Sequence, residues 1–337
     1  MAICNIRSIN RSGLAFDVEG NKIYYALGAL KGVGAQAVES IVATRGEKPF
    51  ADLTDFASRI NPRAVNKRVL ESLASAGAFD VLERERARAF AAVDAMLAAS
   101  QRAHEGAARG QSELFGGQAR ETLAIPSVEP WLPAERLQKE YDAIGFFLSG
   151  HPLDDYAATL KRMRVQSWAE FSRSVKAGGS AGRLAATVVS RTERRIRSGS
   201  KMGIVGLSDP TGHYEAVLFA EGLAQYRDLL EPGTAVLLFL SAEVQGDEVR
   251  ARIQSVEPLE QAAAKLQKGL RVFLRDGAPL ENVAKRLDPK GDGEVSMVLM
   301  LGGDTEVEVK LPGRFNVSPQ IAGAIKAVAG VERVEAL

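Results

Sequence analysis

Two glycines flank a branched apolar residue in the stretch Leu30-Lys31-Gly32-Val33-Gly34, and Ala37, Ile41 and Arg45 follow it at helical spacing. Glycine tolerates positive φ and carries no side chain, so amides at the start of a following helix can face a phosphate oxygen. The pattern therefore predicts a helix, a glycine hairpin and a second helix that hold a DNA backbone without reading its sequence. An ordinary packing turn is the alternative interpretation.

Composition places the chain among globular proteins with several domains. It has 337 residues, of which 46% are hydrophobic, and its net charge is +1. Because the overall charge is so small, any contact with nucleic acid has to come from local basic patches. The single cysteine, Cys4, excludes disulfides and thiolate metal clusters and fits a reducing compartment. No apolar run approaches the roughly 20 residues that span a bilayer, so we expect a cytoplasmic protein with no membrane contact.

The N-terminal part is predicted to be mainly helical. Alternation within residues 12–25 favours a short β-hairpin, and the helical segments that follow include a degenerate second glycine hairpin at Ala76-Gly77-Ala78. Apolar residues at i, i+3 and i+4 predict one amphipathic helix over residues 87–108. We therefore expect three regions: a β-hairpin remnant of a preceding region over 1–27, a tandem helix-hairpin-helix DNA-binding domain over 28–80, and a helical connector over 81–182.

Residues 183–260 change character and predict a small barrel. Strand-like runs cover 184–189, 203–207, 214–219, 235–240 and 248–253, with a helical insert over 222–230. A helix between the third and fourth of five strands is typical of an oligonucleotide-binding (OB) fold. The alternation of the third run places its two aromatic residues, Tyr214 and Phe219, on opposite faces.

The first hairpin of this barrel concentrates positive charge. The segment has one acidic residue, Glu193, and six basic residues: Arg183, Arg191, Arg194, Arg195, Arg197 and Lys201. Such a hairpin can follow the phosphate backbone of a single strand. A solvated charged hairpin without a ligand is the alternative.

Residues 268–337 are predicted to form a small α+β domain. From residue 270 onward it has nine basic and ten acidic residues, a net charge of −1, so a protein partner suits it better than DNA. The predicted fold class is thus a multidomain α + β protein with a helical helix-hairpin-helix domain, a five-stranded OB-fold barrel and a small α+β C-terminal domain.

The sequence shows no catalytic or metal site. Residues 178–182 match a nucleophile elbow in letters but do not follow a strand, and residues 288–293 lack the closing glutamate of a calcium loop. The three histidines are scattered, and the adjacent Asp154 and Asp155 favour helix capping over metal binding. We predict no catalytic residue and no metal ligand in this chain, and an enzyme with unrecognised chemistry stays an alternative.

A second motif carries a family resemblance. Trp131-Leu132, Leu137, Glu140 and the run 144–156, which reads IGFFLSGHPLDDY, closely resemble the connector before the OB barrel in the alpha-subunit family of bacterial DNA polymerase III. The resemblance covers the chain from about residue 12 to its end and concerns the C-terminal portion of the family. It implies that the glycine hairpins hold duplex DNA, at Lys31, Gly32, Val33 and Gly34 and at Ala76 and Gly77.

The same resemblance implies two protein partners. The family carries an internal peptide of the form Gln-x-x-Leu-Phe that binds the beta sliding clamp, and this chain has Gln111-Ser112-Glu113-Leu114-Phe115 at that place. An extended peptide of this kind can bury its Leu and Phe in an apolar pocket while Gln hydrogen-bonds. Residues 268–337 resemble the family's tail domain, which binds the clamp-loader subunit tau.

The resemblance also concerns what would precede residue 1. The family's polymerase palm with its Mg²⁺-binding aspartates and its phosphoesterase-like domain lie upstream, and residues 1–9 depart from the family pattern. We therefore expect no cofactor in this chain and no DNA synthesis by it alone; a truncated reading frame, a split gene and a designed fragment are all open. A free-standing OB-fold protein that binds single strands is the alternative function.

Overall fold

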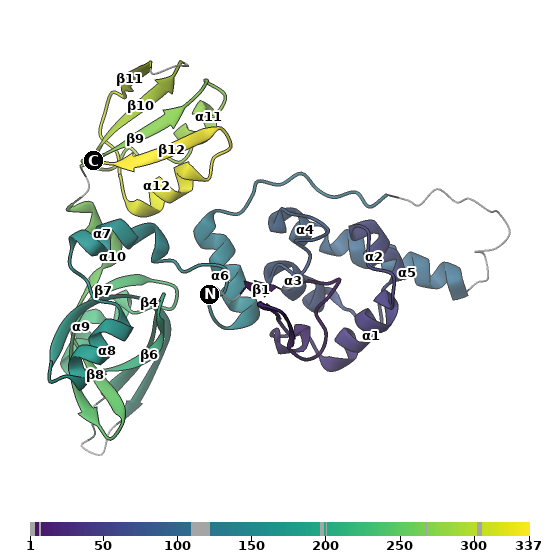
Figure 1. Ribbon diagram of the computed structural model, residues 1–337, viewed down its shortest axis with the longest axis horizontal. Helices are drawn as coiled ribbons and strands as arrows, with labels where there is room; N and C mark the ends of the chain where they lie inside the picture. Colours follow the sequence, from purple (N-terminus) through teal and green to yellow (C-terminus); the bar gives the residue numbers. More distant parts are fainter. Residues whose placement is uncertain are drawn as a thin grey trace. The chain divides into compact units, whose positions relative to one another are not determined.

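The computed structural model forms two compact units, Met1–Ser149 and Gly150–Leu337 (Figure 1). The residues that it describes are 4–6, 8–108, 122–195, 199, 201–266, 268–301 and 305–337. No helix within these ranges is long and apolar enough to cross a membrane.

The first unit begins with a small sheet. Strands β2 (Asp17–Glu19) and β3 (Lys22–Tyr24) form the antiparallel hairpin that alternation predicts, and Gly20 makes the turn at φ +61°. Strand β1 (Cys4–Ile6) pairs with β3 in parallel, which local alternation had not indicated. The hairpin prediction is confirmed, and β1 adds a strand on the other side of β3.

Helices make up the rest of this unit. Their bounds are η1 Leu27–Ala29, α1 Ala35–Arg45, α2 Leu53–Arg59, α3 Lys67–Ser75, α4 Arg86–Ala91, α5 Val93–Ala108 and α6 Pro133–Ile144. Only the single 3-10 turn η1 precedes the first glycine hairpin, so the prediction of a full helix there is wrong. The prediction of a single helix over 87–108 is also wrong, because the helix is interrupted at Ala92. Helix α4 packs on α3, whereas α5 packs mainly on α2.

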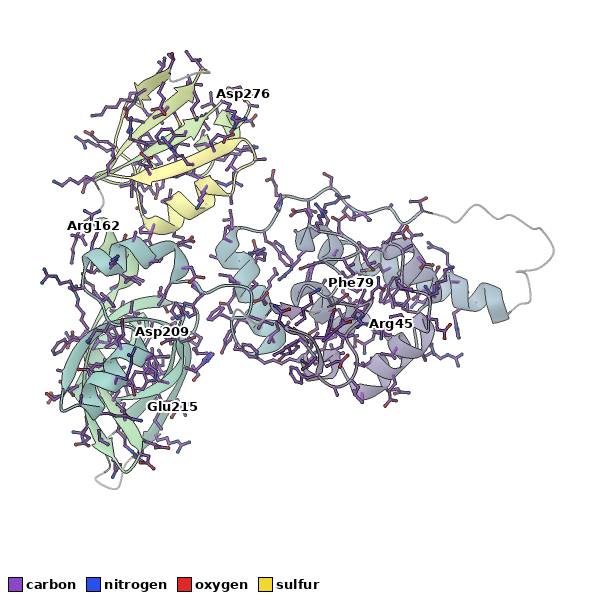
Figure 2. The ribbon with its side chains drawn as sticks, viewed as in Figure 1. Arg45, Phe79, Arg162, Asp209, Glu215 and Asp276 are labelled. Carbon is purple, nitrogen blue, oxygen red and sulfur yellow. The ribbon has the colours of Figure 1, made fainter. Side chains whose placement is uncertain are left out.

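One hydrophobic core holds these helices together. Phe56 lies at its centre, with Phe50 and Phe79 in edge-to-face contact at ring-centroid distances of 5.0 Å each. Figure 2 shows Phe79 among the helices of this unit. Asp52 caps α2 by accepting from the Asp55 amide at 2.7 Å, and Asn66 caps α3 by accepting from the Val69 amide at 3.1 Å.

The second unit contains the predicted barrel. Five strands close in the order β4-β5-β6-β8-β7, and a helical insert lies between the third and fourth. Their bounds are β4 Ala181–Arg195, β5 Lys201–Asp209, β6 Gly212–Phe219, α9 Ala220–Tyr226, η3 Arg227–Leu229, β7 Ala235–Gln245 and β8 Glu248–Pro258. The OB-fold prediction is confirmed, and each strand is longer than the run that predicted it.

A helical segment docks on this barrel. It consists of η2 Asp154–Tyr156, α7 Ala157–Arg162 and α8 Trp168–Lys176. Helix α8 starts at a capping box made by Ser167 and Glu170, and its Phe171 is fully buried in the barrel core. Trp168 stacks on Tyr214 with ring centroids 4.1 Å apart, so α8 closes one end of the barrel.

The C-terminal part is the expected α+β domain. Between the barrel and this domain lies α10 Leu259–Ala264, which packs against η2 and the barrel strands β4 and β7. The elements of the domain are β9 Gly269–Leu274, α11 Leu280–Ala284, β10 Glu294–Met300, β11 Glu306–Lys310, α12 Pro319–Lys326 and β12 Val331–Ala336. The sheet order is β11-β10-β9-β12, with β9 and β10 parallel across the crossover that contains α11. Leu270, Val272 and Leu274 point to a core shared with Val283 and Ile325.

Candidate nucleic-acid interface

The first glycine hairpin presents an open helix start. Gly32 has φ +80°, and Gly34 is the residue before α1 and carries no capping side chain. The amides of Ala37 and Val38 both donate to the Gly34 carbonyl, at 3.1 and 3.2 Å. The amides of the preceding first-turn residues have no intrahelical acceptor available to them. They are therefore directed outward at the positive end of the helix dipole.

Two basic side chains flank this helix start. Arg68, exposed on α3, passes so close to Gly32 that a Cβ there would lie 3.0 Å from the arginine Nε. Lys31 is exposed, and its Nζ lies 5.5 Å from the centroid of the Tyr141 ring. Ser72 Oγ donates to the Lys31 carbonyl at 2.6 Å, which fixes the hairpin on α3. Arg68 is far from the motif in sequence, so the motif alone could not identify it.

The remaining motif residues hold the hairpin in place. Val33, Ala37 and Ile41 are buried in the core of the first unit. Arg45 is half-buried and donates to the carbonyls of Ile9 and Ser12 at 2.9 and 3.0 Å; burial lowers the pKa of its guanidinium (Figure 2). Arg45 therefore ties α1 to the N-terminal segment and does not face outward.

The second hairpin has a different geometry. Ala76 is fully buried, and the amides of Ala76, Gly77 and Ala78 donate to the carbonyls of Ser72, Ala74 and Leu73. Gly77 has φ +78°, and the Arg86 guanidinium covers it so closely that a Cβ would lie 2.4 Å from that group. Ala76 and Gly77 thus form a C-terminal helix cap packed under Arg86. The open amides of the first hairpin have no equivalent at these residues.

The basic hairpin of the barrel divides into paired and outward-facing residues. Arg191 forms an ion pair with Glu231 at 2.9 Å and donates to the carbonyls of Arg227 and Leu230, so it anchors the end of η3. Glu193 pairs with Lys201 at 3.7 Å and with Arg227 at 2.9 Å. Two acidic residues therefore neutralise part of the basic cluster: Glu193 within the hairpin, and Glu231, which is distant in sequence.

Arg194 and Arg195 are exposed at the end of β4, while Arg197 lies outside the described residues. Arg194 pairs across the sheet with Met202 of β5, which in turn pairs with Phe219 of β6. The next outward row consists of Thr192, Ile204, Val217 and Arg252 of β8. The Arg252 guanidinium lies 5.8 Å from the Phe219 ring centroid. We call these two rows the outer platform of the barrel.

The platform has the chemistry of a single-strand track. Phe219 is 49% exposed, whereas Tyr214 is 7% exposed and stacks inside on Trp168, so the prediction of opposite faces is confirmed. Burial raises the pKa of the Tyr214 hydroxyl. An exposed ring with half-buried Met202, Ile204 and Val217 offers an apolar surface for bases. Arg194 at its edge can bind phosphate, whereas Arg252 is already paired with Glu243 at 2.7 Å. Arg194 and Phe219 were predicted from the sequence. Met202, Ile204, Val217 and Arg252 were not, although their outward alternation along the strands was a signal for them.

The peptide Gln111–Phe115 lies outside the described residues. On one side the structure describes α5 up to Ala108, and on the other side the chain resumes at residue 122. The Leu123 amide donates to Thr54 Oγ1 at 3.1 Å, and Leu123 is buried in the core of the first unit. The described residues on both sides of this gap belong to the first unit.

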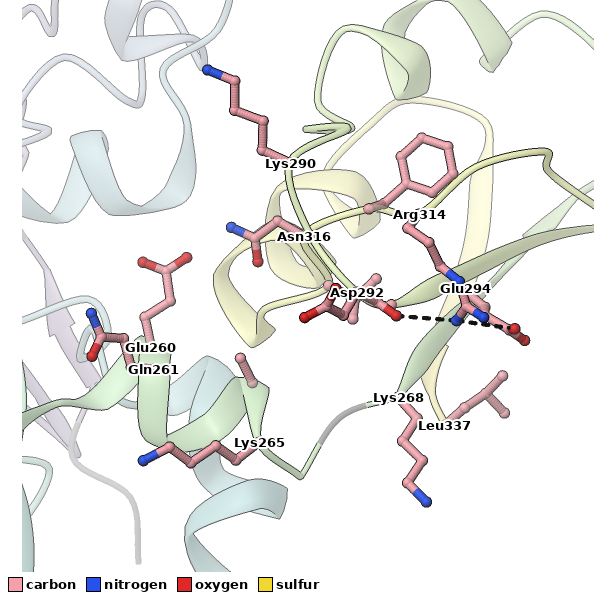
Figure 3. Close-up of a pocket in the computed structure, with 15 residues that line it drawn as sticks. Glu260, Gln261, Lys265, Lys268, Lys290, Asp292, Glu294, Arg314, Asn316 and Leu337 are labelled. Atoms are coloured by element: carbon pink, nitrogen blue, oxygen red, sulfur yellow. Dashed lines mark hydrogen bonds and ion pairs between the residues drawn. The ribbon is translucent and has the colours of Figure 1, made fainter.

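A surface depression lies beside α10 and the C-terminal sheet (Figure 3). It has a volume of about 920 Å³, and four basic and three acidic residues line it: Lys265, Lys268, Lys290, Arg314, Glu260, Asp292 and Glu294. Arg314 is held by Glu294 at 3.1 Å and by the Asp292 carbonyl at 3.1 Å. This mixed and internally paired charge does not form a basic groove. Among the described residues, no three His, Cys, Asp or Glu side chains gather as metal ligands would.

Comparison with known proteins agrees with both domains. The helix-hairpin-helix motif family matches residues 5–89, and the OB-fold nucleic acid binding domain family matches residues 183–259.

Curated relatives extend the match to nearly the whole chain. DNA polymerase III subunit alpha of Caulobacter vibrioides is 42% identical over 97% of this chain and 29% of that protein. The Vibrio cholerae protein of the same name is 31% identical over 97% of this chain and 29% of its own length, and the Escherichia coli K12 protein is 30% identical over 94% and 28%. The chain thus spans less than a third of the length of these relatives. It belongs to the DNA polymerase III alpha-subunit family and corresponds to the C-terminal region of that protein.

Proposed function

We propose that this chain is the DNA-holding region of a replicative DNA polymerase alpha subunit and that it binds single-stranded template on its outer platform. The observation that carries the proposal is the alignment of Arg194, Met202 and Phe219 across three neighbouring strands. Aromatic and apolar side chains stack on bases irrespective of sequence, and the arginines at the platform edge neutralise phosphates. Such sequence-independent binding suits a template strand, which can have any base sequence.

The first glycine hairpin is proposed to hold the duplex. The outward amides at the start of α1 and the side chains of Lys31 and Arg68 supply positive potential around one small surface. Phosphate contacts position a duplex without reading bases. In this proposal Ala76 and Gly77 support the hairpin region from within and make no phosphate contact.

Fluorescence anisotropy with labelled oligonucleotides tests both surfaces. We expect the chain to bind a thymidine 12-mer and a short duplex at low salt, with affinity that falls as salt rises. Alanine at Arg194 and Phe219 together should weaken single-strand binding and spare duplex binding. Equal loss for both ligands, or no single-strand binding by the unaltered chain, would refute the division of roles.

We also propose that Gln111–Phe115 binds the beta sliding clamp and that residues 268–337 bind the clamp-loader tau subunit. The support is the resemblance of these segments to the family. Two weak attachments, one to DNA and one to the clamp, act together through effective concentration and keep the polymerase on its template.

A pull-down with purified clamp tests the peptide. Replacing Leu114 and Phe115 by Ala should abolish clamp retention while DNA affinity stays within about twofold, because the apolar anchors of such peptides carry most of the binding energy. Replacing the neighbouring Ser112 by Ala is the matched control. Clamp retention unchanged by the double substitution would refute the site.

A free-standing single-strand-binding protein is the second candidate, favoured by the outer platform alone. It predicts single-strand affinity with no retention by the clamp, so the same pull-down separates the two functions. Catalysis by the relatives is proposed to need residues beyond this chain. A primer-extension assay with magnesium and deoxynucleotides should therefore show no incorporation by the purified chain, and incorporation would overturn this part of the proposal.

A further inference from the structure

A small hollow adjoins the outer platform on the same three strands. It has a volume of about 260 Å³ and is lined by Val189, Ser190, Gly206, Leu207, His213, Tyr214 and Glu215. Ser190 pairs across the sheet with Gly206, and Gly206 pairs with Glu215, so these residues form the row next to Thr192, Ile204 and Val217. The hollow therefore continues the outer platform away from Arg194 and Phe219.

Gly206 makes room for Ser190 at the centre of this row. A Cβ at Gly206 would lie 2.4 Å from Ser190 Oγ, so the serine hydroxyl takes the space that a side chain at position 206 would fill. The irregularity in β4 between Val188 and Ser190 shifts the strand register at this point. The hollow is therefore lined by the Ser190 side chain beside Gly206, with Glu215 next to Gly206 on β6 and His213 two residues before Glu215 on the same strand.

The charges of the two ends differ. Arg194 is exposed at the platform and Arg252 is paired there with Glu243, whereas Glu215 is exposed on β6 at the hollow and forms no ion pair among the described residues (Figure 2). A carboxylate repels phosphate, so a strand on the platform keeps its backbone near the arginines. The group that enters the hollow is therefore a base, and the imidazole of His213 offers a ring against which the base can stack.

We infer that this hollow is a base-reading subsite that prefers guanine. An ionised carboxylate only accepts hydrogen bonds, and it accepts two in parallel from a planar edge with adjacent donors. The Watson–Crick edge of guanine offers N1–H and the exocyclic amine side by side, and cytosine and adenine offer a single amine group there. Thymine offers one N–H between two carbonyls, which the carboxylate repels. The inference rests on the proposed single-strand binding of the outer platform.

The experiment compares thymidine 12-mers that differ at one central base. The strand can shift its register to bring a single guanine to Glu215, so we expect the guanine 12-mer to bind roughly tenfold more tightly than all-thymidine. Inosine in place of guanine keeps N1–H and lacks the exocyclic amine, so it should lose most of this preference.

Two variants complete the test. Glu215→Gln should remove the guanine preference and leave the affinity for all-thymidine DNA unchanged or slightly higher, since a negative charge is lost. Glu281→Gln removes one exposed carboxylate from α11 in the C-terminal domain and should keep the preference. A guanine preference that survives Glu215→Gln, or equal binding of all 12-mers, would overturn the subsite and leave platform binding intact. Failure of the unaltered chain to bind any 12-mer would instead refute the platform itself.

Discussion

Arg86 and Glu140 form a buried ion pair, with arginine Nη1 3.0 Å from glutamate Oε2 and side chains that are 7% and 0% exposed. Arg86 begins α4, and Glu140 lies within α6. The other oxygen of Glu140 accepts from the amides of Leu148 and Ser149 at 3.0 and 2.7 Å. One carboxylate thus joins the second glycine hairpin to the segment that ends the first unit.

Asp80 completes this arrangement by accepting from Arg86 Nε and Nη2. Burial lowers the pKa of Arg86, but its hydrogen bonds and ion pairs with Asp80 and Glu140 outweigh burial and raise that pKa overall. The guanidinium therefore stays charged inside the unit. Loss of Arg86 leaves the buried Glu140 carboxylate without its cation, whereas loss of Glu140 leaves Arg86 paired with Asp80 but removes one partner of a buried ion pair and the acceptor of the Leu148 and Ser149 amides.

Glu140→Ala should consequently lower the free energy of unfolding of the first unit by about 3–5 kcal/mol. Lys67→Ala removes the exposed ion pair with Asp94 and should leave the free energy of unfolding nearly unchanged, because solvent screens that pair. Hydrogen exchange of the α3, α4 and α6 amides measures both effects within this unit. Equal protection in the two variants would contradict the assigned role of the buried pair.

Substitutions at the two glycines of the first hairpin should act differently. A Cβ at Gly34 meets no heavy atom of the described residues within 4 Å, and its φ of −78° suits any residue. Gly34→Val should therefore preserve the fold and weaken duplex binding by steric exclusion, by roughly tenfold at low salt. Gly32→Val forces a branched side chain into φ +80° beside Arg68 and should also lower stability by about 1–3 kcal/mol.

Duplex anisotropy together with thermal unfolding separates these outcomes. Normal duplex affinity in a folded Gly34→Val protein would mean that the hairpin is only a packing turn.

Substitutions at Arg194 and Arg191 should affect DNA binding and barrel stability differently. Arg194→Ala should weaken single-strand binding and reduce the slope of log K against log salt by roughly 0.7, because one phosphate contact is lost. Arg191→Ala breaks the ion pair with Glu231 and the carbonyl contacts at η3, so it should reduce the thermal stability of the barrel and leave the salt slope unchanged. Salt titrations of both variants measure this difference, and identical slopes would refute it.

His151 should make the stability of the second unit depend on pH. Its Nδ1 accepts from the Leu153 amide at 3.1 Å, so the proton resides on Nε2, which lies 3.1 Å from Ser208 Oγ. Burial, which outweighs the nearby Asp154 and Asp209, lowers the pKa of His151 to about 4. The unfolded chain binds a proton at this histidine near pH 6.5, and the folded protein binds it only near pH 4.

Stability is therefore full above pH 6.5 and falls as the pH drops toward 4, by at most about 3 kcal/mol from this group. Urea unfolding between pH 7.5 and 4.5 checks the change. His151→Gln should be less stable at pH 7.5 and should lose less stability on acidification. An identical pH slope in both proteins would show that His151 does not contribute.

Much of the architecture follows from local pattern. Strand alternation, the turn at Glu19-Gly20-Asn21 and the helix after the third barrel strand are local features, so the hairpin, the OB barrel and the C-terminal domain could be predicted. Breaks in helices were harder to predict. Residues 87–108 have one continuous helical pattern, and the break at Ala92 arises because the two parts pack on two different helices, α3 and α2.

The sequence alone therefore determines most of the helices and strands, including the glycine hairpins and the strands that form the outer platform. Tertiary structure alone decides which charges stay exposed: Arg45 and Arg191 turn toward carbonyls and Glu231, and Arg68 comes to lie beside Gly32. The physical reason is the distance along the chain over which each effect acts. Backbone periodicity acts over a few residues, whereas the partner of a charged side chain is set by contacts between segments tens of residues apart.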